Sequence, residues 1–170
     1  MCGIAGLVDW IDGGVPESRI RAMARSLRHR GPDGEGVYRY GNAALGHRRL
    51  SIIDLAGGAQ PMSNGDGGLW VTYNGEIYNA PELRRELESR GCVFRTHCDT
   101  EVLVNGYEQW GEEVVHRLRG MFAFAVLDQR RDRLFLARDR FGIKPLVYCF
   151  DGGRFWFGSE IKAMLVDSRV

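Results

Sequence analysis

The sequence has no long apolar run and very little lysine. Only Lys144 and Lys162 contribute lysine to the 23 basic residues, which nearly balance the 22 acidic ones. A surface so close to neutral offers no strong electrostatic attraction for nucleic acid or an anionic membrane. No apolar stretch approaches the roughly 20 residues of a membrane span, and residues 1–3 lack the basic segment of a signal peptide. We therefore expect a cytoplasmic protein with no nucleic-acid or membrane partner.

Cysteine is also scarce, and neither a disulfide framework nor a metal site is expected. The four cysteines show no tight repeated spacing, and a reducing cytosol keeps thiols free: Cys2, Cys92, Cys98 and Cys149. The four histidines, alone or with Cys98, fall in no recognised ligand spacing: His29, His47, His97 and His116. These residues predict free thiols and no bound metal.

The length of 170 residues and the apolar content of 44% predict one compact domain over residues 1–170. Helices are expected from Pro16 to a stop at Gly31-Pro32, then over 81–90, 99–110 and 112–118, and from Ser159. Strands are expected over 4–8, 37–40, 43–45, 69–73, 121–127, 134–137, 146–150 and 154–157, with a loop over 57–68. The last three strands are expected to form an antiparallel run. Because 121–127 is apolar at every position, that strand must be covered on both faces. The pattern indicates an α+β fold of stacked sheets sandwiched by helices.

Cys2 is a candidate nucleophile. A thiol attacks acyl carbons as the thiolate, which at neutral pH needs a base. If Met1 is excised, as the small residue at position 2 favours, the α-amino group of Cys2 lies within one side chain of the sulfur and can relay the proton. The alternative is that Cys2 is a small residue before a buried strand, and its position alone does not decide between the two.

Asn74-Gly75 can supply hydrogen-bond donors to an oxyanion. Acyl transfer uses backbone N–H groups or an Asn side chain for this purpose, and this pair offers both kinds. The alternative is structural, because Asn-Gly between two strand-like segments is also the commonest signal of a two-residue hairpin.

Charged residues for an amino-acid substrate are also present. An α-carboxylate requires a fixed cation and an α-ammonium requires one or two fixed anions. Arg48 or Arg49 can supply the first, and Glu76 or Asp99 the second. The alternatives are that the adjacent arginines form a solvated face and that Asp99 caps its helix.

Eight blocks of the sequence together resemble the glutaminase domain of glutamine-dependent asparagine synthetases. They occur in order from residue 2 to about residue 165, and eight ordered blocks are far more specific than any one of them. The blocks are Met1-Cys2-Gly3-Ile4-Ala5-Gly6, His29-Arg30-Gly31-Pro32-Asp33-Gly34, His47-Arg48-Arg49-Leu50-Ser51-Ile52-Ile53-Asp54, Gln60-Pro61-Met62, Asn74-Gly75-Glu76-Ile77-Tyr78-Asn79, Asp99-Thr100-Glu101, Gly120-Met121-Phe122-Ala123-Phe124-Ala125 and Arg138-Asp139-Arg140-Phe141-Gly142-Ile143-Lys144-Pro145-Leu146.

The resemblance implies a class II glutamine amidotransferase with the N-terminal-nucleophile (Ntn) hydrolase fold, a four-layer αββα sandwich of two antiparallel sheets. It implies hydrolysis of L-glutamine through a γ-glutamyl thioester, with no metal or cofactor in this step. The resemblance implies Cys2 as the nucleophile and Asn74 and Gly75 as the oxyanion hole. It implies Arg49 as the ligand of the α-carboxylate and Glu76 and Asp99 as ligands of the α-ammonium. Backbone groups of Ile52 and Ile53 would line the pocket.

Full-length members of the resembled family continue into a synthetase domain, which uses ATP and Mg and which this chain lacks. We expect either a fragment of a longer protein or a stand-alone glutaminase with a separate synthetase partner, and a homodimer is compatible with both. Three alternatives stay open: a non-catalytic module that senses glutamine, a glutaminase serving an acceptor other than aspartate, and another Ntn amidotransferase of the glucosamine-phosphate synthase or phosphoribosyl amidotransferase type.

Overall fold

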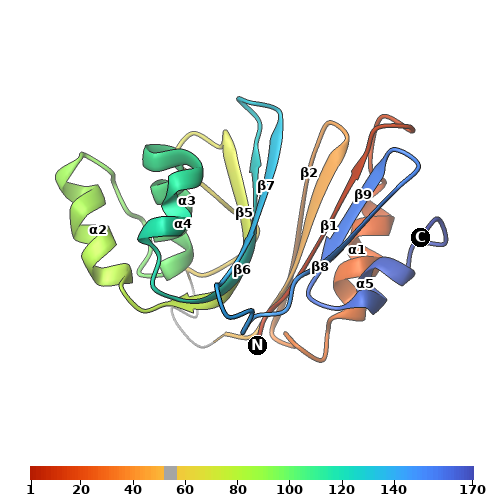
Figure 1. Cartoon of the computed structure of the whole chain (residues 1–170), viewed down its shortest axis with the longest axis horizontal. Coiled ribbons are helices and arrows are strands. Elements are labelled where there is room, and N and C mark those ends of the chain that lie inside the picture. Colours follow the sequence, from red (N-terminus) through yellow and green to blue (C-terminus); the bar gives the residue numbers. More distant parts are fainter. Residues whose placement is uncertain (52–56) are drawn as a thin grey trace.

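The computed structural model describes residues 1–51 and 57–170, which form two antiparallel sheets packed face to face between two layers of helices (Figure 1). The five-stranded sheet has the order β2-β3-β1-β9-β8, and the four-stranded sheet has the order β4-β5-β6-β7. Helices α1 and α5 cover the outer face of the first sheet, and α2, α3 and α4 cover the outer face of the second. The predicted four-layer αββα arrangement is therefore confirmed.

The elements have the following bounds. The strands are β1 (Gly3–Asp9), β2 (Gly34–Tyr40), β3 (Ala43–Arg49), β4 (Met62–Ser63), β5 (Leu69–Ile77), β6 (Gly120–Asp128), β7 (Arg133–Arg138), β8 (Val147–Asp151) and β9 (Arg154–Gly158). The helices are α1 (Glu17–Ser26), α2 (Ala80–Ser89), α3 (Asp99–Trp110), α4 (Val114–Arg117), α5 (Ile161–Leu165) and the 3-10 turn η1 (Gly111–Glu113).

Strand β1 lies in the middle of the five-stranded sheet and fixes the N-terminus. All seven of its residues are buried, and it pairs with β3 on one side and β9 on the other. Its side chains alternate between the helical layer and the second sheet, so Leu7 packs towards α1 while Ile4 and Val8 pack between the sheets. Gly6 leaves room for the ring of Phe157, since a Cβ there would lie 2.0 Å from the Phe157 Cε1 atom. Because β1 is fixed in this way, Cys2, the residue directly before it, is held at the end of the central strand.

Strand β6 has the two covered faces that its continuous apolar sequence predicts. Phe122, Phe124 and Val126 pack into the cluster under α2 and α3, whereas Ala123 and Ala125 pack into the cluster between the two sheets. The small alanines allow the two sheets to approach closely, and the large aromatic residues fill the space under the helices. This strand therefore joins the two halves of the core.

Several predicted boundaries are wrong, for local or topological reasons. Helix α1 ends at Ser26, and Leu27 begins a turn before Gly31. Strand β5 continues to Ile77 because β6 pairs with it along its whole length, and the predicted loop over 57–68 contains the short strand β4. The hairpins β6-β7 and β8-β9 are both antiparallel as predicted, but they do not form one run, because the chain crosses to the other sheet between β7 and β8.

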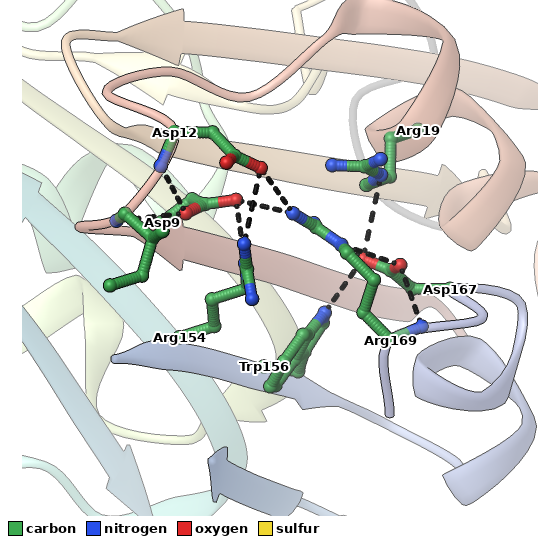
Figure 2. A network of polar contacts seen from close by, with 8 residues as sticks. Asp9, Asp12, Arg19, Arg154, Trp156, Asp167 and Arg169 are labelled. Carbon is green, nitrogen blue, oxygen red and sulfur yellow. Dashed lines mark hydrogen bonds and ion pairs between the residues drawn. The ribbon is translucent and has the colours of Figure 1, made fainter. Parts of the chain in front are cut away.

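A network of charged residues joins the far end of β1 to the C-terminal residues (Figure 2). The Asp9 carboxylate, which is fully buried, accepts hydrogen bonds from Arg154 Nε at 3.1 Å and Arg169 Nη1 at 2.6 Å. Asp12 reaches the same arginines at 3.3 Å and 2.8 Å. Burial would raise the pKa of Asp9, but these arginines and the backbone N–H groups of residues 11 and 12 outweigh it and lower that pKa. The end of β1 is thus fixed by charge.

Asp167 is the second carboxylate of this network. It accepts hydrogen bonds from Trp156 Nε1 at 3.0 Å and Arg169 Nη2 at 2.8 Å, and Arg19 lies 3.5 Å away (Figure 2). Burial would raise its pKa, but Arg169 and Trp156 lower it to about 2. Asp167 therefore joins α1, β9 and the C-terminal residues.

Within residues 1–51 and 57–170, no helix has the length and apolar character needed to cross a bilayer.

Candidate active site

Cys2 is the residue directly before β1, next to the N-terminus that Figure 1 marks at one end of the two sheets. Its side chain is half-buried. The N–H of Leu50, just after β3, donates a hydrogen bond to the Cys2 sulfur at 3.4 Å. The Cys2 thiol in turn donates to the Leu50 carbonyl oxygen at 3.7 Å, so the sulfur is held at the end of β3.

The backbone of Cys2 is also held in place. Arg30 Nε donates a hydrogen bond to the Cys2 carbonyl oxygen at 3.0 Å, and Arg30 Nη1 pairs with Glu160 at 2.9 Å. The Arg30 side chain is only 10% exposed. Burial would raise the pKa of Glu160, but Arg30 and His29 lower it to about 2, so this carboxylate stays charged at neutral pH. The N-terminus is therefore anchored by a half-buried charged pair.

A cavity of about 170 Å³ opens beside Cys2. The predicted site residues that the structure describes all line it: Cys2, Arg49, Asn74, Gly75, Glu76 and Asp99. The predicted contribution of Ile52 and Ile53 lies outside the described residues. Met1 lines the same cavity, so its removal would enlarge the space as well as expose the amine.

Asn74 and Gly75 form no hairpin, because β5 continues through both residues. Asn74 is 2% exposed, and its Nδ2 donor has no hydrogen-bond partner among the described residues. An unsatisfied buried donor costs about 1–3 kcal/mol, and such a group fits a site that awaits an acceptor. At Gly75 a Cβ would lie 2.4 Å from the Met121 carbonyl oxygen, so only glycine fits there. The structural alternative for this pair is wrong.

Of the two adjacent arginines, only Arg49 lines the cavity. Arg48 points away and is almost fully buried, which contradicts the solvated-face alternative. Its guanidinium donates to the Gly31 carbonyl at 2.9 Å and to Glu35 at 3.1 Å, under the loop before β2. Of this pair, Arg49 is therefore the one that a carboxylate in this cavity would meet.

Asp99 and Glu76 add two carboxylates to the lining of the cavity. Asp99 is the first residue of α3, and its N-cap is Cys98, so the prediction that Asp99 caps the helix is wrong. Instead, Asp99 Oδ2 accepts hydrogen bonds from Tyr73 Oη at 2.7 Å and from the Ile77 N–H at 3.1 Å. The cavity lining thus contains two cations, Arg49 and Lys144, and two carboxylates, so it offers both charges that a zwitterionic amino acid requires.

A second thiol, Cys98, lines the cavity but is a poor nucleophile. It is buried, and its sulfur donates to Thr100 Oγ1 at 3.2 Å. Burial raises the pKa of the Cys98 thiol above its usual value. Cys98 therefore stays protonated at neutral pH, which leaves Cys2 as the candidate nucleophile of the cavity.

His47 is a poor general base at neutral pH, because its imidazole binds a proton only weakly. It is buried between β3 and β5, where its Nδ1 lies 3.1 Å from Thr72 Oγ1. Burial first, and then the charges of Arg49 and Arg48, lower the pKa of His47 to about 3. His47 is therefore a neutral residue under the site.

Several residues of the site had no prediction. They are Arg30, Leu50, Gln60 and Lys144, which occur in resemblance blocks without a role, and Tyr73, which occurs in none of the blocks. Gln60 joins two elements, since its Oε1 accepts from the Tyr73 N–H at 2.7 Å and its Nε2 donates to Thr100 at 3.2 Å. The alternation of β5 could have suggested Tyr73, but the contacts of Arg30 and Leu50 with Cys2 span 28 and 48 residues and leave no local signal.

Two solved enzyme structures have the same fold. The glutamine phosphoribosylpyrophosphate amidotransferase of B. subtilis superposes with a TM-score of 0.81 at 24% identity, over 97% of this chain and 43% of that one. The allosteric regulatory enzyme of purine biosynthesis gives 0.78 at 26% identity, with the same coverage. The paired sheets, the flanking helices and the cysteine before the central strand define an amidotransferase of the Ntn hydrolase class.

The family follows from the sequence of the whole chain. Residues 1–170 match the model of the glutamine amidotransferase domain, and the chain belongs to that family. It is 47% identical over 169 residues to "Asparagine synthetase [glutamine-hydrolyzing] 3" of Bacillus subtilis (strain 168) and 46% identical over 169 residues to "Asparagine synthetase [glutamine-hydrolyzing] 3" of Arabidopsis thaliana. The matches include 97% and 98% of this chain but only 27% and 29% of those relatives, so the chain spans less than a third of their length.

Proposed function

We propose that this domain hydrolyses L-glutamine to glutamate and ammonia, with Cys2 as nucleophile. The observation that supports this best is the lining of a single cavity. The Cys2 thiol, the Asn74 donor that lacks a partner among residues 1–51 and 57–170, and the charges of Arg49 and Asp99 all contribute to it. A metabolite with an amide at one end and a zwitterion at the other matches this arrangement of groups.

The reaction requires that Met1 has first been removed from the chain. In the first step, the freed Cys2 amine takes the proton of the Cys2 thiol. The sulfur attacks the side-chain amide carbon of glutamine, and the Asn74 side chain and the Gly75 N–H stabilise the oxyanion, each by about 3 kcal/mol. The protonated amine then gives its proton to the leaving ammonia, which leaves a γ-glutamyl thioester. Water attacks this thioester to release glutamate and restore the thiol.

The substrate is held through its α-groups. Arg49 binds the α-carboxylate, while Asp99 and Glu76 bind the α-ammonium. The backbone of Ile52 and Ile53 completes the proposed pocket. The step requires no metal or cofactor, because the amine performs the proton transfers and the donors carry the oxyanion charge.

We further propose that the ammonia passes to a synthetase partner, on the same or a separate chain, which uses ATP and Mg to amidate a carboxylate. The names of the relatives favour aspartate as acceptor, and another acceptor is the alternative. A cytoplasmic location and a homodimer belong to the same proposal. An assay of the full-length gene product with glutamine, ATP and aspartate, followed by amino-acid analysis for asparagine, distinguishes the acceptors.

Glutamate release from glutamine by the purified domain tests the hydrolysis itself. Cys2→Ala and Cys2→Ser should abolish release with the fold retained, whereas the matched control Cys149→Ser, at a thiol on β8, should not. Undiminished release by Cys2→Ala would place the nucleophile elsewhere. Binding of glutamine without any release by the Met1-free protein would instead support the non-catalytic sensing alternative.

A further inference from the structure

Tyr73 and Asn74 are consecutive residues of β5 that face opposite sides of the sheet. Asn74 faces the nucleophile side, whereas the buried ring of Tyr73 packs into the cluster under α2 and α3. Tyr73 nevertheless lines the cavity as well, because its hydroxyl reaches the first residue of α3. One strand thus contributes to both ends of the proposed substrate.

The two oxygens of the Asp99 carboxylate have different surroundings. Oδ2 already accepts two hydrogen bonds from β5, from the Tyr73 hydroxyl at 2.7 Å and from the Ile77 N–H at 3.1 Å. Within residues 1–51 and 57–170, Oδ1 has a long contact, with the Cys98 thiol at 3.7 Å. A carboxylate fixed through one oxygen keeps the charge and lone pairs of the other for a cationic ligand.

We propose that Tyr73 is a positioning residue that fixes Asp99 so that Oδ1 meets the α-ammonium of the substrate, and that it thereby makes the site selective for amides with an α-amino group. This inference rests on the proposed glutaminase function. It assigns the selectivity to a hydroxyl that touches the carboxylate and not the substrate.

The protonation state of Tyr73 suits this role. Burial first, and then the negative charge of Asp99, raise the pKa of Tyr73 well above 10, so the hydroxyl remains a donor at any pH at which the enzyme works. The position of Tyr73 is fixed independently, since its backbone N–H donates to Gln60 Oε1 at 2.7 Å. The Gln60 amide also donates to Thr100 on α3, so β5 and the start of α3 are connected twice.

The test compares glutamine with 4-carbamoylbutanoate, which is glutamine without the α-amino group. In Tyr73→Phe, KM for glutamine should rise about tenfold while kcat changes less than about twofold, because a hydrogen bond to a charged ligand-binding group is lost. The inhibition constant of 4-carbamoylbutanoate against glutamine hydrolysis should stay unchanged, since this compound has no ammonium for Asp99. An equal weakening of both compounds, or an unchanged KM for glutamine, would refute the positioning role.

Tyr107→Phe is the matched control, because Tyr107 is a buried tyrosine of the same cluster whose hydroxyl lies 3.5 Å from Asp128. It should leave both constants as in the wild type. In an Asp99→Asn background, Tyr73→Phe should add no further rise in KM, and full additivity would contradict action through Asp99. If the wild type releases no glutamate, the proposed function itself fails. If the wild type releases glutamate and Tyr73→Phe has the same KM for glutamine, only the inference about Tyr73 fails.

Discussion

The Nε atom of Arg30 donates a hydrogen bond to the carbonyl oxygen of Cys2 across 28 residues of sequence, at 3.0 Å. The same guanidinium is paired with Glu160 at 2.9 Å, so a rotation of Arg30 away from Cys2 would also break this ion pair. The nucleophile is therefore placed by a side chain that does not contact the proposed substrate. Displacement of a reacting group by about 1 Å can reduce a rate on the order of a hundredfold.

We accordingly expect Arg30→Gln to lower kcat for glutamine hydrolysis on the order of tenfold to a hundredfold, with a smaller effect on KM. Steady-state kinetics would measure this. The control is Arg28→Gln, which changes an exposed arginine two residues earlier and should have no effect. Wild-type kcat in Arg30→Gln would show that the hydrogen bond to Cys2 is dispensable.

Retention of Met1 should inactivate the domain. With Met1 present, the nitrogen of Cys2 is an amide and not a base, and Met1 occupies part of the cavity lining. A lysine inserted between Met1 and Cys2 should prevent excision and reduce glutamate release by a factor on the order of 10² or more, the usual contribution of a general base. Intact mass would establish the N-terminus of each preparation. Full activity in the extended protein would exclude the Cys2 amine as base.

Arg49→Lys should bind glutamine less well than the wild type but better than Arg49→Ala. Lysine retains the charge and loses the planar pair of donors that matches a carboxylate. A loss of about 1.5–3 kcal/mol in Arg49→Ala corresponds to an increase in KM on the order of ten- to a hundredfold. Equal KM values in all three proteins would reject Arg49 as the carboxylate ligand.

The C-terminal network should make stability depend on acid pH. Asp167 has its pKa lowered from an ordinary value of 3.8 to about 2, in spite of burial, mainly by hydrogen bonds from Arg169 and Trp156. A lowered pKa stabilises the folded state above pH 3.8, and this stabilisation is lost as the pH falls towards 2. The shift is equivalent to about 2 kcal/mol.

Urea unfolding at pH 7 and pH 3 would measure this dependence. Asp167→Asn should be less stable than the wild type at pH 7, and the difference should shrink at pH 3. The control is Asp151→Asn, at an exposed residue of β8, where little change is expected. A difference that grows on acidification would contradict the assignment.

The sequence predicts the layers of this fold well, because they depend on local pattern. The continuous apolar run 121–127 required a strand covered on both faces, and β6 is that strand. Pairing between distant segments overrides local signals elsewhere. Asn74-Gly75 has the sequence of a hairpin turn, but β6 pairs with β5 through both residues and keeps the strand extended. The switch between sheets from β7 to β8 likewise has no local signature.

The site was predictable as far as residue chemistry allows. A cysteine at position 2, an Asn-Gly pair and opposed charges indicate acyl transfer on an amino acid, and the cavity contains all of these. Which of Arg48 and Arg49 faces the cavity depends on the register of β3 in its sheet, and which contact Asp99 makes depends on how α3 meets β5. Those answers come from packing between elements, so neither follows from the local sequence.

Strand β1 begins next to Cys2 and ends at Asp9, which is held by Arg154 and Arg169. A strand can slide against its neighbours only in steps of one residue, about 3.4 Å, and each step turns every side chain to the opposite face. With one end held by Arg30 and the other by buried charge, β1 is restrained from sliding at both ends. The arginines of Figure 2 thus help to fix the register of β1, and with it the position of Cys2 at the other end of the strand. Substitution of these arginines is expected to displace the Cys2 sulfur although no residue of the cavity is changed.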